Sequence, residues 1–265
     1  MDGLNKKRFF AFGCSYTGHI AGTWADYIGS NFEEYYNFGR GGACNTYIMS
    51  KFIEADIKYK FNYETDYIVV MFTNFNRFSY YDKVGWKLQG SVYKNETYPE
   101  QFRNQMWSED WGIYNSWIAI NTIKQLLRYK QLKNKLLMSM DSLYYQDSPF
   151  DDTLTNALST KFVNNIYNSL SDSESLDSWK GKRYKMPDDY ELYIKEDFRD
   201  AHPTQKMHYE FMRDKFPQFD TEESKNTFEL LESIKDTSSW HNQQQSYALN
   251  FNQQKNKALA NAPLF

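Results

Sequence analysis

The chain has 265 residues, of which 41% are hydrophobic and 18% aromatic, and its formal net charge is −3. This composition indicates a globular protein with ample material for a core, and it argues against a disordered chain. Two cysteines exclude a disulfide-stapled secreted scaffold, and the slight negative charge argues against a dedicated nucleic-acid binder. No apolar run reaches the roughly 18–20 residues of a membrane span, and the polar start precedes only four apolar residues, too few for a signal peptide.

We therefore expect a cytoplasmic protein. The abundance of Asn, Lys and Tyr is typical of AT-rich genomes such as those of phages and marine microbes. A phage-encoded protein would act in the virion or in the cytoplasm of the host.

Short apolar runs alternate with helical patterns in the first half of the chain. Residues 9–12 and 67–72 predict buried strands, and the second run is nearly continuous, as in a central parallel strand. Residues 35–38 predict a weaker strand between them. A tight turn after the first strand leads into a helix that begins near residue 20 and ends near Gly29, and a second helix is expected from residue 45 to 59.

Residues 79–112 are rich in aromatic and polar side chains and are interpreted as an insertion or lid. Four further elements are expected beyond it: a helix over 113–132, a strand over 136–140, a helix near 154–170 and a helix up to about residue 216 in which Pro203 takes the first position. The tail has one amphipathic piece and then becomes rich in Gln and Asn. We divide the chain into an α/β domain over 1–216 and a polar, partly helical extension over 217–265.

Strands that alternate with helices predict the α/β class with a mainly parallel sheet. Ligands of such sheets bind beyond the carboxyl ends of the strands. Five residues with suitable chemistry follow strands or precede the last helix: Ser15, Gly42, Asn74, Asp200 and His202. They supply a nucleophile, donors for an oxyanion, a base and an acid that orients the base, which is the set that acyl transfer needs.

Four blocks in this order resemble the SGNH hydrolase superfamily of GDSL-type esterases and lipases. They are Phe12-Gly-Cys-Ser-Tyr-Thr17, Asn37-Phe-Gly-Arg-Gly-Gly-Ala-Cys-Asn45, Val70-Met-Phe-Thr-Asn74 and Asp200-Ala-His-Pro203. The resemblance implies a three-layer α/β/α sandwich with a flavodoxin-like sheet. It implies Ser15 as nucleophile, His202 as base and Asp200 as its orienting acid. The N–H groups of Ser15 and Gly42 and the amide of Asn74 would hold the oxyanion.

The chain departs from the family pattern at three positions. Cys14 stands where the family has Asp, and Phe72 where it has Gly. Asp200 precedes His202 by two residues rather than three, so Asp197 is kept as a second candidate for the acid. A histidine at a helix N-terminus lies at the positive end of the helix dipole, and it needs a nearby carboxylate to serve as a base.

Each of these candidate residues also has a purely structural interpretation. A serine at a strand-to-helix turn often caps the helix, and glycines suit any tight turn. Arg77 is a candidate for binding an anionic substrate or for a salt bridge, and Asn45 is a further candidate for substrate binding. Cys14 adjoins the serine and is a third candidate for substrate binding. A buried structural thiol is preferred for it over a thiol nucleophile. The aromatic residues of the insertion can stack on sugars, but packing is the simpler expectation.

The remaining histidines are His19, His208 and His241, and their spacing is not that of metal ligands. No metal or other cofactor is therefore expected. The sequence thus predicts a serine esterase that cleaves an O-acetyl or short acyl ester of a carbohydrate or small lipid through an acyl-enzyme. Two alternatives stay open, a binding or structural protein with little catalysis and an acyltransferase. The expected partner is a small-molecule or carbohydrate ester, without nucleic acid or membrane, and a homo-oligomer is compatible with the polar tail.

Overall fold

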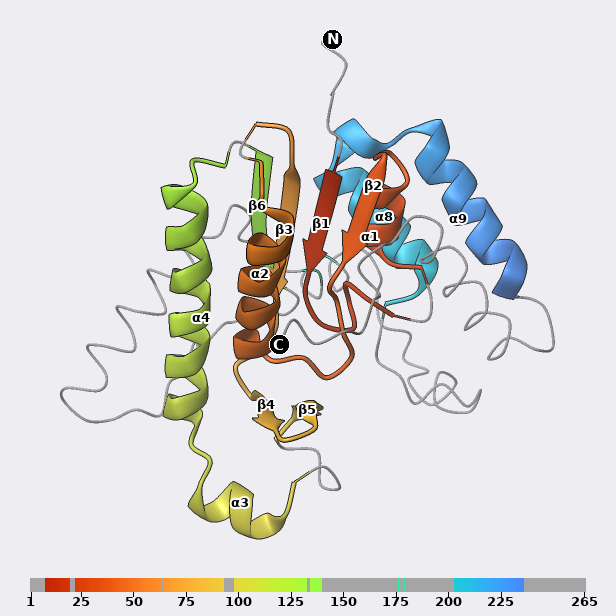
Figure 1. Ribbon diagram of the computed structural model, residues 1–265. Coiled ribbons are helices and arrows are strands. Elements are labelled where there is room, and N and C mark those ends of the chain that lie inside the picture. The colour runs from red at the N-terminus through yellow and green to blue at the C-terminus, as the bar shows by residue number, and fades with distance from the viewer. Residues whose placement is uncertain are drawn as a thin grey trace.

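The computed structural model describes residues 8–19, 22–62, 64–92, 98–132, 134–139, 176, 179 and 203–235 (Figure 1). Four strands form a parallel sheet in the order β2-β1-β3-β6. Their bounds are Arg8–Phe12 for β1, Glu34–Asn37 for β2, Tyr67–Phe72 for β3 and Asn134–Ser139 for β6. An antiparallel hairpin of β4 (Arg77–Asp82) and β5 (Gly85–Ser91) lies beyond the carboxyl ends of these strands.

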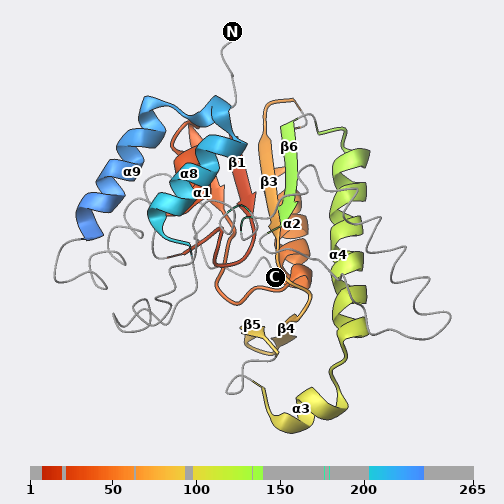
Figure 2. The ribbon, with the colours of Figure 1, turned by 180° about the vertical axis from the view of Figure 1, so that it is seen from behind.

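Helices cover both faces of the four-stranded sheet. The helices are α1 (Trp24–Gly29), α2 (Asn45–Tyr59), α3 (Glu100–Gln105), α4 (Glu109–Tyr129), α8 (Gln205–Lys215) and α9 (Glu222–Lys235), with a 3₁₀ turn η1 at Pro217–Phe219. The view from behind shows α1 and α8 on the face opposite to α2 (Figure 2). The predicted α/β class with a mainly parallel sheet is confirmed. Among the described residues, no helix combines the length and the apolar character that crossing a membrane requires.

Alternation along β1 builds the core on both faces of the sheet. Phe12 faces α2, where its ring centroid lies 5.3 Å from that of Phe52. Phe9 faces the other side, with its centroid 5.3 Å from that of Phe32. All six residues of β3 are buried, because this strand pairs on both edges and is covered on both faces. The apolar run 67–72 therefore forms a central strand, as the sequence predicts.

A partly buried ion pair closes the amino-terminal side of the sheet. The guanidinium of Arg8 donates from Nε to Asp66 Oδ1 at 2.9 Å and from Nη2 to Asp66 Oδ2 at 2.7 Å. Asp66 is fully buried and also accepts the backbone N–H of Asn62 at 2.6 Å. This bidentate pair joins the start of β1 to the residue before β3.

Side-chain caps decide where two helices begin. The expectation that Pro203 takes the first position of α8 is wrong. Thr204 caps that helix with its hydroxyl, which accepts the N–H of Met207 at 3.2 Å. The proline therefore lies one residue outside the cap. α4 begins one turn earlier than predicted, because the hydroxyl of Ser108 accepts the N–H of Trp111 at 3.2 Å.

The interpreted insertion and extension both contain regular structure. The insertion over 79–112 holds most of the β4–β5 hairpin, α3 and the start of α4. In the extension, α9 packs against α1, where Ser224 donates to the carbonyl of Tyr27 at 2.8 Å and the ring centroid of Phe228 lies 6.0 Å from that of Tyr27. The helix expected near 154–170 lies outside the described residues.

Candidate active site

Three of the predicted site residues lie at one edge of the sheet. β1 runs between β2 and β3, parallel to both, so the turns that follow these strands emerge side by side. Ser15 lies in the turn after β1, Gly42 in the turn after β2 and Asn74 after β3. The pairing order of the strands thus brings together positions that are far apart in the chain, at the edge where α/β proteins bind ligands.

Ser15 lies in a tight turn over residues 14–18. The backbone N–H groups of Thr17 and Gly18 both donate to the carbonyl of Cys14 at 3.0 Å. The expectation that a helix begins directly after this turn and directs its N–H groups at the serine is wrong, because α1 begins only at Trp24. The N–H groups of Thr17 and Gly18 are instead used inside the turn. Ser15 itself is 5% exposed.

The serine turn and the glycine-rich turn are in direct backbone contact. A Cβ atom added to Gly18 would lie 2.3 Å from the carbonyl oxygen of Gly39, so only glycine permits this approach. The N–H of Arg40 also donates to the carbonyl of Gly13 at 3.2 Å. The first two sequence blocks are therefore one structural unit.

Asn37, the first residue of the second block, bridges the two turns with its side chain. Its Nδ2 donates to the carbonyl of Thr17 at 2.8 Å and to the hydroxyl of Tyr35 at 2.7 Å. Its Oδ1 accepts the N–H of Gly39 at 2.8 Å. This side chain therefore fixes both turns relative to each other, a role that the sequence comparison alone did not show.

The buried carboxyl group of Asp26 is linked to the serine turn through the hydroxyl of Thr23. The hydroxyl of Thr23 lies 2.8 Å from the carbonyl of Thr17 and 2.9 Å from Oδ2 of Asp26. A hydroxyl has one proton, so when it donates to Thr17 the contact to Asp26 is a hydrogen bond only if Asp26 carries a proton. Burial raises the pKa of Asp26 above its ordinary value, against the opposing effect of its hydrogen bonds, which favours that protonated form.

Sequence reasoning missed this support, although its signal is present. Thr23 and Asp26 have the Thr-x-x-Asp spacing of a capping box, and the backbone N–H of Thr23 donates to Asp26 Oδ2 at 2.8 Å. Tyr35 adds a hydrogen bond to Oδ1 of Asp26 at 3.0 Å. The motif marks the start of α1, eight residues after the serine.

The β4–β5 hairpin packs on the turn that contains Gly42. This residue has a φ of +75°, in the left-handed region, and its carbonyl accepts the N–H of Gly90 at 3.1 Å. A Cβ atom at position 42 would lie 2.9 Å from the carbonyl oxygen of Leu88. The part of the chain interpreted as an insertion or lid is thus in contact with the predicted oxyanion turn.

Asn74 is half-buried just after the end of β3. Its Oδ1 accepts the N–H of Asn76 at 3.0 Å, which orients the side-chain amide. The proposed oxyanion role uses the other end of that amide, its Nδ2. Phe72, where the family has glycine, is fully buried as the last residue of β3, so its ring is part of the core.

Asn45 connects three elements and is itself buried. Its Oδ1 accepts the N–H of Thr73 at 2.8 Å, and its Nδ2 donates to the carbonyl of Thr73 at 2.8 Å and to Ser116 Oγ at 3.0 Å. Both amide protons are therefore used within the protein, and neither is left for a substrate. This side chain holds the start of α2 against the end of β3 and against α4.

The other candidate binding residues lie in different surroundings. Cys14 is fully buried, and it is not joined to the buried Cys44 by a disulfide. Arg77 is half-buried at the start of β4, where it lines a cavity described below. Among the described residues, no three His, Cys, Asp or Glu side chains come together as a metal site requires.

The predicted base and acid, His202 and Asp200, lie outside the described residues, as do Asp197 and His241. Pro203, which follows His202 in the chain, is buried and precedes α8. In that helix His208 is 3% exposed, and its ring meets that of Tyr16 edge-on with the centroids 6.2 Å apart. α8 therefore packs against the residue that follows Ser15. His19, in the described part, is half-buried.

Comparison of the chain with family models, with curated proteins and with solved structures gave no match.

Proposed function

We propose that the chain is a serine esterase of the SGNH type, with the three-layer sandwich of that superfamily. The observation that carries the proposal is the arrangement of the first three blocks. Strand order places Ser15, Gly42 and Asn74 at one edge of the sheet, and the turns of the first two are in backbone contact through Gly18 and Gly39. A nucleophile and two oxyanion donors must converge on one carbonyl group, and adjacent strand ends supply that convergence.

The mechanism follows from the roles that the resemblance implies. Ser15 Oγ attacks the ester carbonyl carbon while His202, oriented by Asp200, takes the hydroxyl proton. The N–H groups of Ser15 and Gly42 and the amide of Asn74 hold the oxyanion. His202 then protonates the departing alcohol. Water attacks the acyl-enzyme, His202 accepts the proton of that water, and the acid product leaves with Ser15 regenerated.

The surroundings of Ser15 favour a small acyl group. Only 5% of the residue's surface is exposed, and the hairpin packs on the neighbouring Gly42 turn. A long acyl chain would have to pass between these elements, whereas an acetyl or similarly short group needs little space. We therefore propose an O-acetyl or short acyl ester of a carbohydrate or small molecule as the substrate.

Labelling with a fluorophosphonate, followed by measurement of intact mass, tests the proposal. We expect one equivalent of label on the native protein, because only an activated serine reacts at an appreciable rate. Ser15→Ala abolishes the label, and Ser233→Ala, which changes an exposed serine on α9, leaves it unchanged. Absence of labelling in the folded native protein, or persistence of the label in Ser15→Ala, would refute the esterase.

A second candidate function is ligand binding on this scaffold without catalysis. Two observations favour it: Ser15 is almost entirely buried, and the β4–β5 hairpin covers part of the predicted oxyanion turn. A protein of this kind would give no label with the fluorophosphonate while it still binds a ligand. The same experiment therefore separates the two functions.

A further inference from the structure

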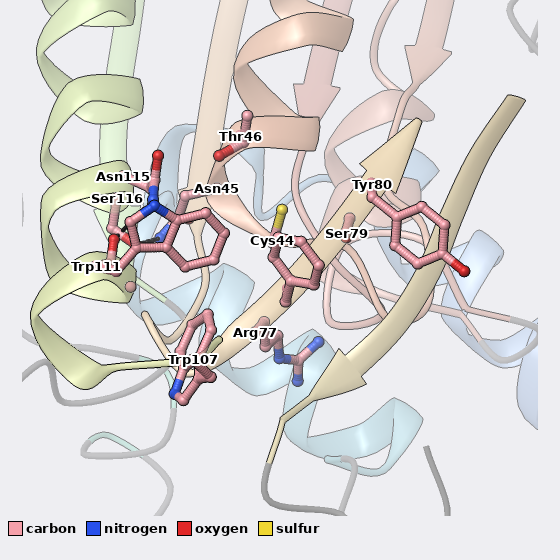
Figure 3. A pocket seen from close by; sticks show the side chains of 12 residues that line it. Cys44, Asn45, Thr46, Arg77, Ser79, Tyr80, Trp107, Trp111, Asn115 and Ser116 are labelled. Atoms are coloured by element: carbon pink, nitrogen blue, oxygen red, sulfur yellow. Dashed lines mark hydrogen bonds between the residues drawn. The ribbon is translucent and has the colours of Figure 1, made fainter. Parts of the chain in front are cut away.

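A cavity of about 270 Å³ lies where the amino-terminal ends of α2 and α4 meet strand β4 (Figure 3). Its described lining contains none of Ser15, Gly42 and Asn74, so it is separate from the proposed catalytic positions. Its volume is close to the lower end of the roughly 300–1,000 Å³ range of small-molecule sites. The cavity is therefore large enough for one ring-sized ligand.

Aromatic side chains form the walls of the cavity. The rings of Trp107 and Trp111 meet edge-on with centroids 5.4 Å apart, and the Phe78 centroid lies 5.1 Å from that of Trp111. In Figure 3 the two indoles lie on one side and the ring of Tyr80 lies on the opposite side. Trp111 and Tyr80 remain 41% and 40% exposed, so flat apolar faces are available at the cavity's rim.

Two polar side chains in the lining have hydrogen-bonding capacity that the described residues do not use. Thr46, in the first turn of α2, is half-buried, and its hydroxyl makes no hydrogen bond with those residues. Asn115, in α4, donates from Nδ2 to the carbonyl of Trp111 at 2.7 Å, while its Oδ1 accepts no hydrogen bond from them. A hydroxyl donates and accepts, and an amide oxygen accepts. Both side chains can therefore pair with hydroxyl groups of a ligand.

A sugar ring matches this combination better than other small ligands. A pyranose has an apolar C–H face that packs on an aromatic ring, and its hydroxyls project from the edge of the ring toward polar groups. A flat aromatic ligand stacks best between parallel walls, whereas the planes of Trp107 and Trp111 meet at 88°. A purely aliphatic ligand would leave Thr46 and Asn115 without partners.

We propose that the cavity binds a neutral pyranose ring. The apolar face of the sugar packs on the indole of Trp111, with Tyr80 on the opposite side of the cavity, and its hydroxyls bond to Thr46 Oγ1 and Asn115 Oδ1. These contacts use dispersion and neutral hydrogen bonds, so they require no charge on the sugar. The cavity shares no residue with the proposed catalytic positions, so sugar binding there is independent of the esterase chemistry.

Isothermal titration with the methyl glycosides of glucose, galactose, mannose and N-acetylglucosamine tests this assignment. We expect at least one of them to bind with a Kd in the millimolar range or tighter. Sorbitol, which has the hydroxyls without the ring, and benzyl alcohol, which has a flat ring with one hydroxyl, should bind at least about tenfold more weakly. None of these compounds carries an ester, so the titration is independent of the labelling of Ser15.

Two variants remove the proposed contacts one at a time. Trp111→Ala removes a ring at the rim and should weaken sugar binding by about threefold to tenfold. Asn115→Ala removes the amide acceptor and should weaken binding by about threefold or more. Alanine is the most favourable residue in a helix, so we expect both proteins to keep the native circular dichroism spectrum.

Each variant has a matched control on the same helix. Asn121→Ala removes an amide that bonds to the carbonyl four residues earlier, that of Trp117, at 3.0 Å, as Asn115 does, but that lies outside the lining of the cavity. Tyr129→Ala removes an aromatic residue that is 84% exposed at the other end of α4. Both controls should leave the affinity for the sugar unchanged.

Three results would overturn the proposed sugar site. The first is that none of the methyl glycosides binds to the native protein. The second is an equal affinity for sorbitol or benzyl alcohol, which would show that ring and hydroxyls are not recognised together. The third is an affinity that Trp111→Ala and Asn115→Ala leave unchanged, which would place the sugar elsewhere on the protein.

Discussion

Replacing Gly18 by alanine perturbs the contact that joins the serine turn to the glycine-rich turn. The added Cβ would lie 2.3 Å from the carbonyl oxygen of Gly39 and 2.7 Å from its carbonyl carbon. This is roughly 1 Å closer than an ordinary non-bonded contact, and both partners are backbone, so the two turns must move apart. Overpacking of this kind costs about 1–3 kcal/mol, which lowers Tm by about 2–12 °C in a chain of this size.

The same movement displaces Ser15 relative to Gly42. A misplacement of about 1 Å reduces the rate of a reaction that depends on alignment by about 10²-fold. The rate of fluorophosphonate labelling, followed by intact mass beside a thermal unfolding curve, measures both effects. Gly41→Ala is the matched control, because a Cβ there meets no atom within 4 Å, and it should change Tm and labelling rate little.

Two results would refute this reasoning. Equal Tm and equal labelling rates for Gly18→Ala and Gly41→Ala would show that the close approach of the turns is not a constraint. A lowered Tm with unchanged labelling would show that the contact supports the fold alone, and the link between the turns and the proposed oxyanion site would fail.

Three further substitutions test other buried contacts. Asn45→Ala removes three hydrogen bonds between buried groups, so the free energy of unfolding measured in urea should fall by about 3–5 kcal/mol. Arg8→Met leaves the fully buried carboxylate of Asp66 without its cation and should cost about 3–5 kcal/mol, whereas an unchanged urea midpoint would contradict the inferred pair. The raised pKa of Asp26 means that the folded state binds this proton more tightly, so its contribution is greatest at low pH and is lost as pH rises through the raised pKa. Asp26→Asn should therefore flatten the pH dependence of urea unfolding above the ordinary aspartate pKa of 3.8, and parallel curves for the two proteins would refute the assignment.

The sequence by itself determined the position of the main elements of the sheet. The apolar run of β3 and the helical pattern of α2 (Asn45–Tyr59) predicted their elements, because hydrophobic periodicity reports directly which residues must be buried. Helix starts were predicted less well. Thr204 and Ser108 set the starts of α8 and α4 through single side-chain hydrogen bonds, which periodicity does not contain.

For the candidate site, the sequence predicted the positions of residues at strand ends but not the hydrogen bonds of their side chains. The order of the blocks placed Ser15, Gly42 and Asn74 at strand ends, and parallel strands necessarily bring such ends to one edge. The roles of His202 and Asp200 stay predictions. Asn45 looked like a substrate contact in the sequence, because a pattern of residue types does not reveal that its amide is already bonded to Thr73.

Tertiary structure alone decided which of these segments touch. The contact of Gly18 with Gly39, the carboxyl of Asp26 below the serine turn and the aromatic cavity beside Arg77 each join segments that no local pattern connects. The physical reason is that hydrophobic patterning determines which face of an element is buried but not its partner. The partner follows from strand pairing, from the backbone approach that glycine permits and from the need to pair each buried polar group.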